Sequence, residues 1–173
     1  MLTVLVIDES RSRAGEICAG LALAGYQVAA ILAGSENLTA EVEKLQPDVI
    51  LIDTDSPSRD TLEHLAAMNK NMPRPVVIFT QEDGQATIRD AVKAGVSAYI
   101  VDGLDPKRIK PIVEVARARF EDTQALRREL DEISQKKVNF FTRQFIDALS
   151  PSNFALTNPQ VFRETVGTHG QNL

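Results

Sequence analysis

The stretch Pro47-Asp48-Val49-Ile50-Leu51-Ile52-Asp53-Thr54-Asp55 contains an unbroken apolar run that stops abruptly at carboxylates. A run of Val, Ile and Leu bounded by turn-prone polar residues is typical of a central strand of a parallel sheet, buried on both faces. Asp53 then lies at the carboxyl end of that strand. Because ligands bind at the carboxyl ends of strands in open α/β sheets, Asp53 is a candidate functional residue.

The composition of the whole chain fits one globular domain with some length left over. Its 173 residues are 43% hydrophobic and 25% charged, with a net charge of −5 and one cysteine. No apolar run is long enough to span a bilayer, and the N-terminus lacks the basic-then-apolar pattern of a signal peptide. We therefore expect a cytoplasmic protein without a membrane partner. Its mild acidity argues against a surface that coats nucleic acid.

Strand patterns and helix patterns alternate five times along the chain with short connections. This alternation predicts an α/β fold, a doubly wound five-stranded parallel sheet with helices on both faces. The predicted strands cover residues 2–7, 27–32, 49–53, 76–80 and 97–101, and predicted helices cover 10–25, 36–45, 58–69 and 84–94, with Ser10 as the first N-cap and Gly25 and Gly95 at helix ends.

Acidic and hydroxyl side chains lie at the carboxyl ends of three predicted strands. Asp8 and Glu9 follow the first strand, Asp53 ends the third, and Thr80 ends the fourth. With the strand order 2-1-3-4-5, the first and third strands are neighbours, so their acids converge on one crevice. Clustered carboxylates repel one another unless a cation or a proton intervenes. A hard cation such as Mg²⁺ beside these carboxylates and a hydroxyl indicates phosphoryl transfer onto an aspartate.

Four ordered motifs coincide with these strand ends, at residues 4–9, 48–53, 77–80 and 94–99. They resemble the successive motifs of response-regulator receiver domains, whose fold is flavodoxin-like, and the resemblance covers about residues 1–135. Within that family, three stretches are similar to the AmiR/NasT-type antitermination regulators. They are Leu51-Ile52-Asp53-Thr54-Asp55-Ser56-Pro57, Phe79-Thr80-Gln81 and Tyr99-Ile100-Val101-Asp102-Gly103-Leu104.

The resemblance implies a role for each of these residues and a partner for the domain. It implies two-component signalling, with a histidine kinase or sensor protein acting on the receiver. Tyr99 either reports signalling through its rotamer or simply packs. The implied site consists of Asp53 as phosphoacceptor, Thr80 as switch hydroxyl, and Asp8, Glu9, Asp53 and the backbone carbonyl of Asp55 as ligands of Mg²⁺.

One position departs from the family pattern. Receivers usually carry a lysine after the fifth strand that pairs with the phosphoryl group, and the aligned residue is Asp102. At an effective dielectric near 20, two unit charges about 4 Å apart interact by roughly 4 kcal/mol. The interaction with a phosphoryl group is attractive for a lysine and repulsive for an aspartate. Two functions stay open for the receiver domain: phosphorelay through Asp53, and a phosphorylation-independent module controlled by a bound sensor protein. Neither is an enzyme in the usual sense.

From Pro106 the pattern predicts one long helix with apolar residues at three- and four-residue spacing. Beyond about Phe120 the helix outruns the domain, and its apolar stripe needs another partner. A homodimeric coiled coil supplies one; the alternative is that the extension folds back or frays. We predict a receiver domain over 1–120, a helical extension over 121–137 and a tail of unrelated origin over 138–173.

The predicted tail, from Asn139 onward, resembles the segment ahead of the catalytic core in polyhydroxyalkanoate synthases. It contains no nucleophile elbow, so synthase chemistry is not predicted. A third function, an adaptor that associates with a synthase or granule through this tail, is implied by the resemblance alone. An AmiR/NasT regulator would carry an RNA-binding module here, but basic residues are few, and RNA binding is not predicted. The alternative is a helical tail with a coincidental likeness. The resemblance rests on Phe141-Thr142-Arg143-Gln144, on the stretch from Ala148 to Phe154 and on Thr157-Asn158-Pro159.

Overall fold

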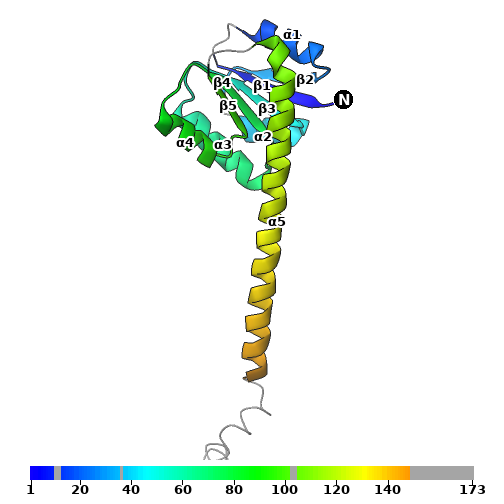
Figure 1. The fold of residues 1–173 in the computed structure, drawn as a ribbon, viewed down its shortest axis with the longest axis vertical. Coiled ribbons are helices and arrows are strands. Elements are labelled where there is room, and N and C mark those ends of the chain that lie inside the picture. Colours follow the sequence, from blue (N-terminus) through cyan, green and yellow to red (C-terminus); the bar gives the residue numbers. More distant parts are fainter. Residues whose placement is uncertain (10–12, 36, 102–104, 149–173) are drawn as a thin grey trace, which may run out of the picture. The chain divides into compact units, whose positions relative to one another are not determined.

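The computed structural model describes residues 1–9, 13–35, 37–101 and 105–148. Strands and helices alternate through the first unit of the chain, Met1–Thr123, and a second unit begins at Gln124 (Figure 1). Asp102 and most of the predicted tail lie outside the described residues. No helix in the described part of the chain is both long and apolar enough to cross a membrane.

One parallel sheet forms the centre of the first unit. Its strands lie in the order β2-β1-β3-β4-β5, which confirms the predicted doubly wound topology. All residues of β3 and β4 are buried, as their continuous apolar runs indicate. The strands are β1 (Thr3–Asp8), β2 (Gln27–Leu32), β3 (Val49–Asp53), β4 (Val76–Thr80) and β5 (Ala98–Val101).

Helices pack on both faces of this sheet. Because successive side chains of a strand point to opposite faces, Ile50 and Ile52 of β3 enter one core and Leu51 enters the other. The first core is covered by α2 (Leu38–Leu45), α3 (Arg59–Asn71) and α4 (Gln85–Lys93), and the second by α1 (Ala14–Leu23) and the start of α5 (Ile109–Ala148), which follows a single 3-10 turn, Pro106–Arg108 (Figure 1).

The ends of the helices follow local sequence signals in most places. Ser58 caps α3, where its hydroxyl accepts a hydrogen bond of 3.0 Å from the backbone N–H of Thr61. Gly25 and Gly95 follow α1 and α4 with positive φ angles of 83° and 93°, as predicted. The first helix differs, because it begins at Ala14 with Arg13 at the N-cap. Ser10, the predicted cap, lies outside the described residues.

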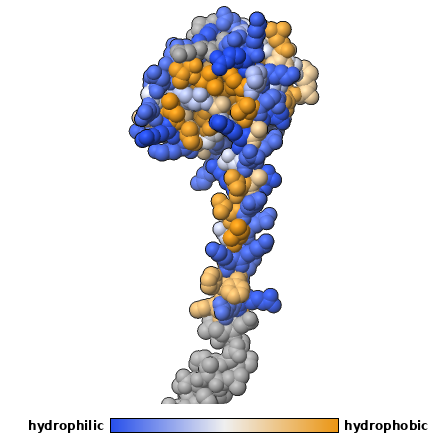
Figure 2. All heavy atoms as spheres, in the orientation of Figure 1, coloured by the Kyte–Doolittle hydropathy of each residue, from blue (hydrophilic) through white to orange (hydrophobic). Residues whose placement is uncertain are grey.

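The apolar side chains of the long helix α5 are buried at its start and exposed further along. In the first unit Ile109, Val113 and Ala116 are fully buried in the second core. In the second unit α5 runs to Ala148 and so continues past residue 137, where the sequence suggested a boundary. Large apolar side chains are exposed along this part (Figure 2), namely Leu126, Leu130, Ile133, Val138, Phe140, Phe141, Phe145 and Ile146.

Candidate functional site

Two acids from different strands meet at the carboxyl end of the sheet. Asp8 of β1 and Asp53 of β3 are direct register partners, as the predicted strand order requires. Both side chains are buried, with 2% and 0% of their surface exposed. The backbone N–H of Glu9 donates to the carbonyl oxygen of Asp53 over 3.0 Å and ties the first loop to β3. Two buried carboxylates this close favour a cation or a proton between them.

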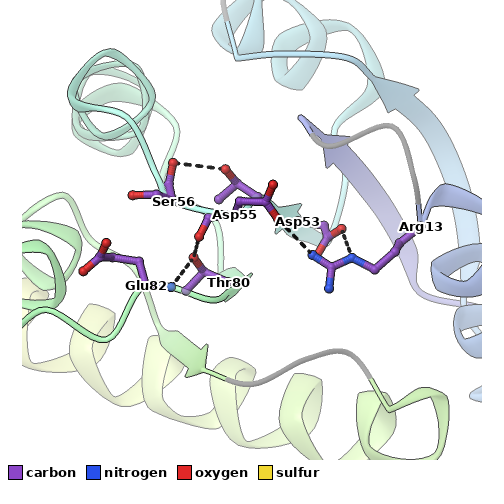
Figure 3. Close-up of polar contacts among 7 residues, drawn as sticks. Arg13, Asp53, Asp55, Ser56, Thr80 and Glu82 are labelled. Atoms are coloured by element: carbon purple, nitrogen blue, oxygen red, sulfur yellow. Dashed lines mark hydrogen bonds and ion pairs between the residues drawn. The ribbon is translucent and has the colours of Figure 1, made fainter.

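The guanidinium of Arg13 lies against Asp53, a contact that the sequence did not reveal. Its Nε donates to Oδ2 of Asp53 over 3.1 Å, and its Nη2 lies 3.8 Å from Oδ1 of Asp55 (Figure 3). The Arg13 side chain is 22% exposed, and that of Asp55 is 82% exposed. The sequence signal was weak, because Arg11 and Arg13 both follow Glu9 within four residues and neither is marked by the sequence as the partner of Asp53.

Thr80 connects the loops that follow β3 and β4. Its hydroxyl donates to the backbone carbonyl oxygen of Asp55 over 2.9 Å and accepts from the backbone N–H of Glu82 over 3.2 Å (Figure 3). The backbone N–H of Gln81 also donates to the Asp55 carbonyl oxygen, over 3.2 Å. Both lone pairs of this carbonyl oxygen are therefore used inside the protein.

Glu9 points its carboxylate at helix α3. Its Oε1 accepts a hydrogen bond of 2.7 Å from the hydroxyl of Thr61, which is itself buried. The Thr61 hydroxyl also lies 2.9 Å from that of Ser58. Nearby, the hydroxyl of Ser35 lies 3.1 Å from Nδ1 of His64, and these side chains line a polar cavity of about 220 Å³. Sequence reasoning did not identify this cluster, because its members come from three distant loops and helices.

The four oxygen ligands implied for Mg²⁺ are not assembled as a set. Asp8 and Asp53 lie together, but the Glu9 carboxylate is bound to Thr61, and the Asp55 carbonyl is bound to Thr80 and Gln81. Over the described residues, no group of three or more His, Cys, Asp and Glu side chains is arranged to hold a metal ion. In this arrangement Asp8 and Asp53 are placed together to hold a cation such as Mg²⁺, whereas Glu9 and the Asp55 carbonyl would have to leave their present partners to join them.

Tyr99 lies in β5 with its hydroxyl turned toward the loop before α4. It donates a hydrogen bond of 2.9 Å to the backbone carbonyl oxygen of Glu82, two residues after Thr80. Burial raises the pKa of the Tyr99 phenol. Tyr99 and Thr80 therefore contact the same short loop. Asp102, at the usual lysine position, lies outside the described residues.

Comparison with known proteins identifies the family of the domain that contains this site. The family model of the response regulator receiver domain matches residues 4–114, which is well over half of the chain. The chain belongs to the response regulator receiver family. Receiver domains of this family act in two-component signalling.

Relatives of the receiver domain include the transcriptional regulatory protein PdtaR of Mycobacterium tuberculosis strain H37Rv. It is 23% identical over 142 residues, which cover 80% of this chain and 68% of PdtaR. Among solved structures, the CheY-like receiver domain protein of Methanospirillum hungatei JF-1 superposes with a TM-score of 0.61 at 19% identity, over 71% of this chain and 98% of that one. At this identity the structural likeness establishes the receiver fold alone.

A second family model matches the C-terminal part of the chain. The model of the poly-beta-hydroxybutyrate polymerase (PhaC) N-terminus matches residues 113–173. The polymerase subunit PhaC of Rhizobium etli is 52% identical over 44 residues, which are 25% of this chain and 7% of that subunit. This confirms the resemblance seen in the tail, and the match begins earlier than expected, within α5. The chain spans only a small fraction of the polymerase.

Proposed function

We propose that this chain is a two-component response regulator whose receiver domain accepts a phosphoryl group on Asp53. The observation that carries the proposal is the placement of Asp8, Asp53 and Thr80 at the carboxyl ends of the adjacent strands β1, β3 and β4. A carboxylate oxygen of Asp53 forms a bond to phosphorus, and the bond from phosphorus to the donor breaks. The donor is a phosphorylated histidine kinase or a small acyl phosphate.

The signal would leave the site through Thr80. In the structure the Thr80 hydroxyl holds the Asp55 carbonyl oxygen, and a phosphoryl oxygen on Asp53 would compete for this donor. Loss of that bond would free the loop that Tyr99 also contacts through Glu82. Whether Tyr99 then changes rotamer or only packs distinguishes two versions of the switch. Mg²⁺ binding by Asp8 and Asp53 stays a prediction.

The proposal is tested by the intact mass of the protein after incubation with Mg²⁺ and acetyl phosphate. The expected result is a gain of one phosphoryl group in the wild type and in Asp60→Asn, and none in Asp53→Asn. Asp60 is a matched control, because it is an exposed aspartate in the first turn of α3. Absence of the gain in wild-type protein with a normal circular dichroism spectrum would contradict phosphorylation.

A phosphorylation-independent module is the alternative function for the same domain. The ion pair between Arg13 and the buried Asp53 favours it, because Asp53 already has a cationic partner. Here a sensor protein would bind the receiver directly and control it without chemistry at Asp53. An Asp53→Asn variant that keeps wild-type affinity for its sensor and wild-type output would support this alternative, and a loss of output would exclude it.

For the output of the regulator, we propose control of transcription by a dimer. The motif resemblance to AmiR/NasT antitermination regulators and the similarity to the transcriptional regulatory protein PdtaR over 80% of the chain support a transcriptional role. The exposed apolar residues of α5 after Gln124 support a homodimer formed through this helix. RNA binding by this chain is not part of the proposal, since basic residues are few near its C-terminus.

The second family match supports a further candidate function, association with a polyhydroxyalkanoate polymerase. The segment lacks a catalytic core, yet it is 52% identical to the Rhizobium etli polymerase subunit over 44 residues. Such a segment could act as an adaptor that brings the receiver to the polymerase. Co-purification of PhaC with the full chain, and its loss in a Phe141→Ser, Phe145→Ser double variant, would support the adaptor. Retention by the variant, or no co-purification at all, would contradict it.

A further inference from the structure

The geometry points to Arg13 as the resident cation of the Asp53 site: its guanidinium neutralises this carboxylate in the resting domain, and a divalent cation must displace it in order to bind. The inference deepens the proposed function and rests on it for the assignment of Asp53 as the functional carboxylate. Arg13 is a positioning residue in this scheme, because it acts on the site through Asp53.

The exposure of the two partners separates this ion pair from ordinary surface pairs. Arg13 is 22% exposed and Asp53 is 0% exposed, whereas Arg59 and Glu63, which also form a pair, are 90% and 60% exposed. Exposed pairs contribute little because solvent screens them. A pair with one fully buried carboxylate is screened far less, and removal of the cation leaves a buried negative charge. Arg13 is therefore placed to determine the electrostatics of the site.

The backbone of Arg13 is tied to the first turn of α1. Its carbonyl oxygen accepts a hydrogen bond of 3.0 Å from the N–H of Ile17, a residue of α1 that is fully buried in the second core. The guanidinium reaches across to the end of β3, where Nε contacts Asp53, and to the loop that follows, where Nη2 lies near Asp55 (Figure 3). A long flexible stem on an anchored backbone lets the charged group leave the site without unfolding α1.

Two other oxygen atoms that could bind a metal ion already accept hydrogen bonds inside the protein. Glu9 is bound to Thr61, and the Asp55 carbonyl oxygen is bound to Thr80 and Gln81. A divalent cation between Asp8 and Asp53 would lack both of these oxygen ligands and would also meet the positive charge of Arg13 beside Asp53. Like charges within a few ångströms repel strongly in a poorly solvated site. Arg13 and a divalent cation are therefore competitors for Asp53.

The test is the affinity of the full-length, metal-free protein for Mn²⁺, measured by isothermal titration calorimetry without any phosphodonor. We expect Arg13→Gln to bind Mn²⁺ at least about tenfold more tightly than the wild type, and Arg13→Lys, which keeps the charge, to bind like the wild type. Arg59→Gln is the matched control, because it removes the same charge from an exposed pair, and we expect unchanged affinity.

Equal affinity in the wild type and Arg13→Gln, or no Mn²⁺ binding by either, would overturn the inference. If Arg13→Gln fails to fold, the wild type still provides a test, because the Nε–H resonance of Arg13 must shift when Mg²⁺ is added. A resonance that stays in place while Mg²⁺ binds would overturn the inference too. Because no phosphodonor is present, these results are independent of whether Asp53 can be phosphorylated.

Discussion

The hydroxyl of Thr80 donates a hydrogen bond of 2.9 Å to the backbone carbonyl oxygen of Asp55, which links the ends of β4 and β3. Thr80 is fully buried, and its hydroxyl also accepts from the Glu82 backbone N–H. Replacing Thr80 by Val removes both bonds and leaves buried polar groups without this partner. We expect Thr80→Val to lower the free energy of unfolding by about 1–3 kcal/mol.

Urea unfolding checks this prediction. Thr80→Ser keeps the hydroxyl and should lose less stability than Thr80→Val, and Thr39→Val, at an exposed position of α2, should stay within about 0.5 kcal/mol of the wild type. Equal stability of Thr80→Val and Thr39→Val would show that the link between the two loops contributes nothing to the resting state.

Substitutions at two glycines distinguish the stability cost of backbone strain from that of steric overlap. Gly25 and Gly95 both have positive φ angles, but a Cβ at Gly25 would meet nothing within 4 Å, whereas one at Gly95 would overlap Nδ2 of Asn69. Gly25→Ala should therefore lose about 1–2 kcal/mol from strain alone. Gly95→Ala should lose at least about 1 kcal/mol more, because Asn69 also gives up its bonds to the carbonyl oxygens of Ala94 and Gly95.

Thermal and urea unfolding of the two variants measure this difference directly. In the background of Asn69→Ala, the additional loss at Gly95 should shrink toward the value found at Gly25, because the overlapping side chain is gone. An equal loss at both glycines in the wild-type background would mean that the Asn69 contact is not formed in solution.

Tyr26 predicts how stability responds to alkaline pH. Its hydroxyl donates to Oε1 of Glu114 over 2.8 Å, and burial together with this carboxylate raises the Tyr26 pKa from 10.0 to about 12. A raised pKa means that the stabilisation is fully present below pH 10 and is lost as the pH rises through about 12. The shift of about two units corresponds to at most roughly 2.7 kcal/mol.

The measurement is the free energy of unfolding of the wild type and Tyr26→Phe at several pH values between 9 and 12. The difference between the two proteins isolates Tyr26, because lysines titrate in both. We expect the difference in the free energy of unfolding between the wild type and Tyr26→Phe to decrease over this range. Tyr99→Phe, which retains Tyr26, should show the same decrease relative to Tyr26→Phe. A pH-independent difference would refute the raised pKa of Tyr26.

The apolar stripe of α5 predicts the oligomeric state. Leu126, Leu130 and Ile133 recur at i, i+4 and i+7, and each is more than half exposed. Replacing Leu126 and Leu130 by Glu should raise the dissociation constant of the dimer at least about a hundredfold, since each buried leucine contributes about 1.5–3 kcal/mol. Light scattering coupled to size-exclusion chromatography of the full chain measures this.

The matched control carries Glu at positions 124 and 128, which replaces Gln124 and Arg128. These residues lie away from the leucines, about 120° to 160° around the helix axis. We expect this double variant to remain dimeric. A wild-type chain that stays monomeric at high concentration would refute dimerisation through α5.

The sequence was sufficient for those features that depend on local pattern and on strand order. The continuous apolar runs gave the strands, and their order placed Asp8 beside Asp53. The partners of Arg13 and Glu9 were not predictable in this way. Arg13 reaches a residue 40 positions away and Glu9 reaches Thr61, 52 positions away. Such contacts depend on the rotamers of long side chains, which no periodicity in the sequence records.

The length of the second resemblance also differed from the sequence interpretation. The composition changes near Gln135, which predicts a tail from 138 onward, but the match to the polymerase N-terminus begins at residue 113. Residues such as Val113 and Ala116 serve the core of the receiver domain and also lie inside that match. Composition alone does not mark where the second match begins, because the apolar helical pattern runs through α5.

The position of β1 at the interior of the sheet has a consequence for synthesis of the protein. This first strand pairs with β2 and with β3, so its second hydrogen-bonded edge is satisfied only after residue 53 has been made. Until then, Val4, Leu5, Val6 and Ile7 belong to an unfinished sheet with an open apolar edge, which favours aggregation. The nascent chain is therefore exposed to aggregation on the ribosome until β3 has been made and Asp8 and Asp53 have met.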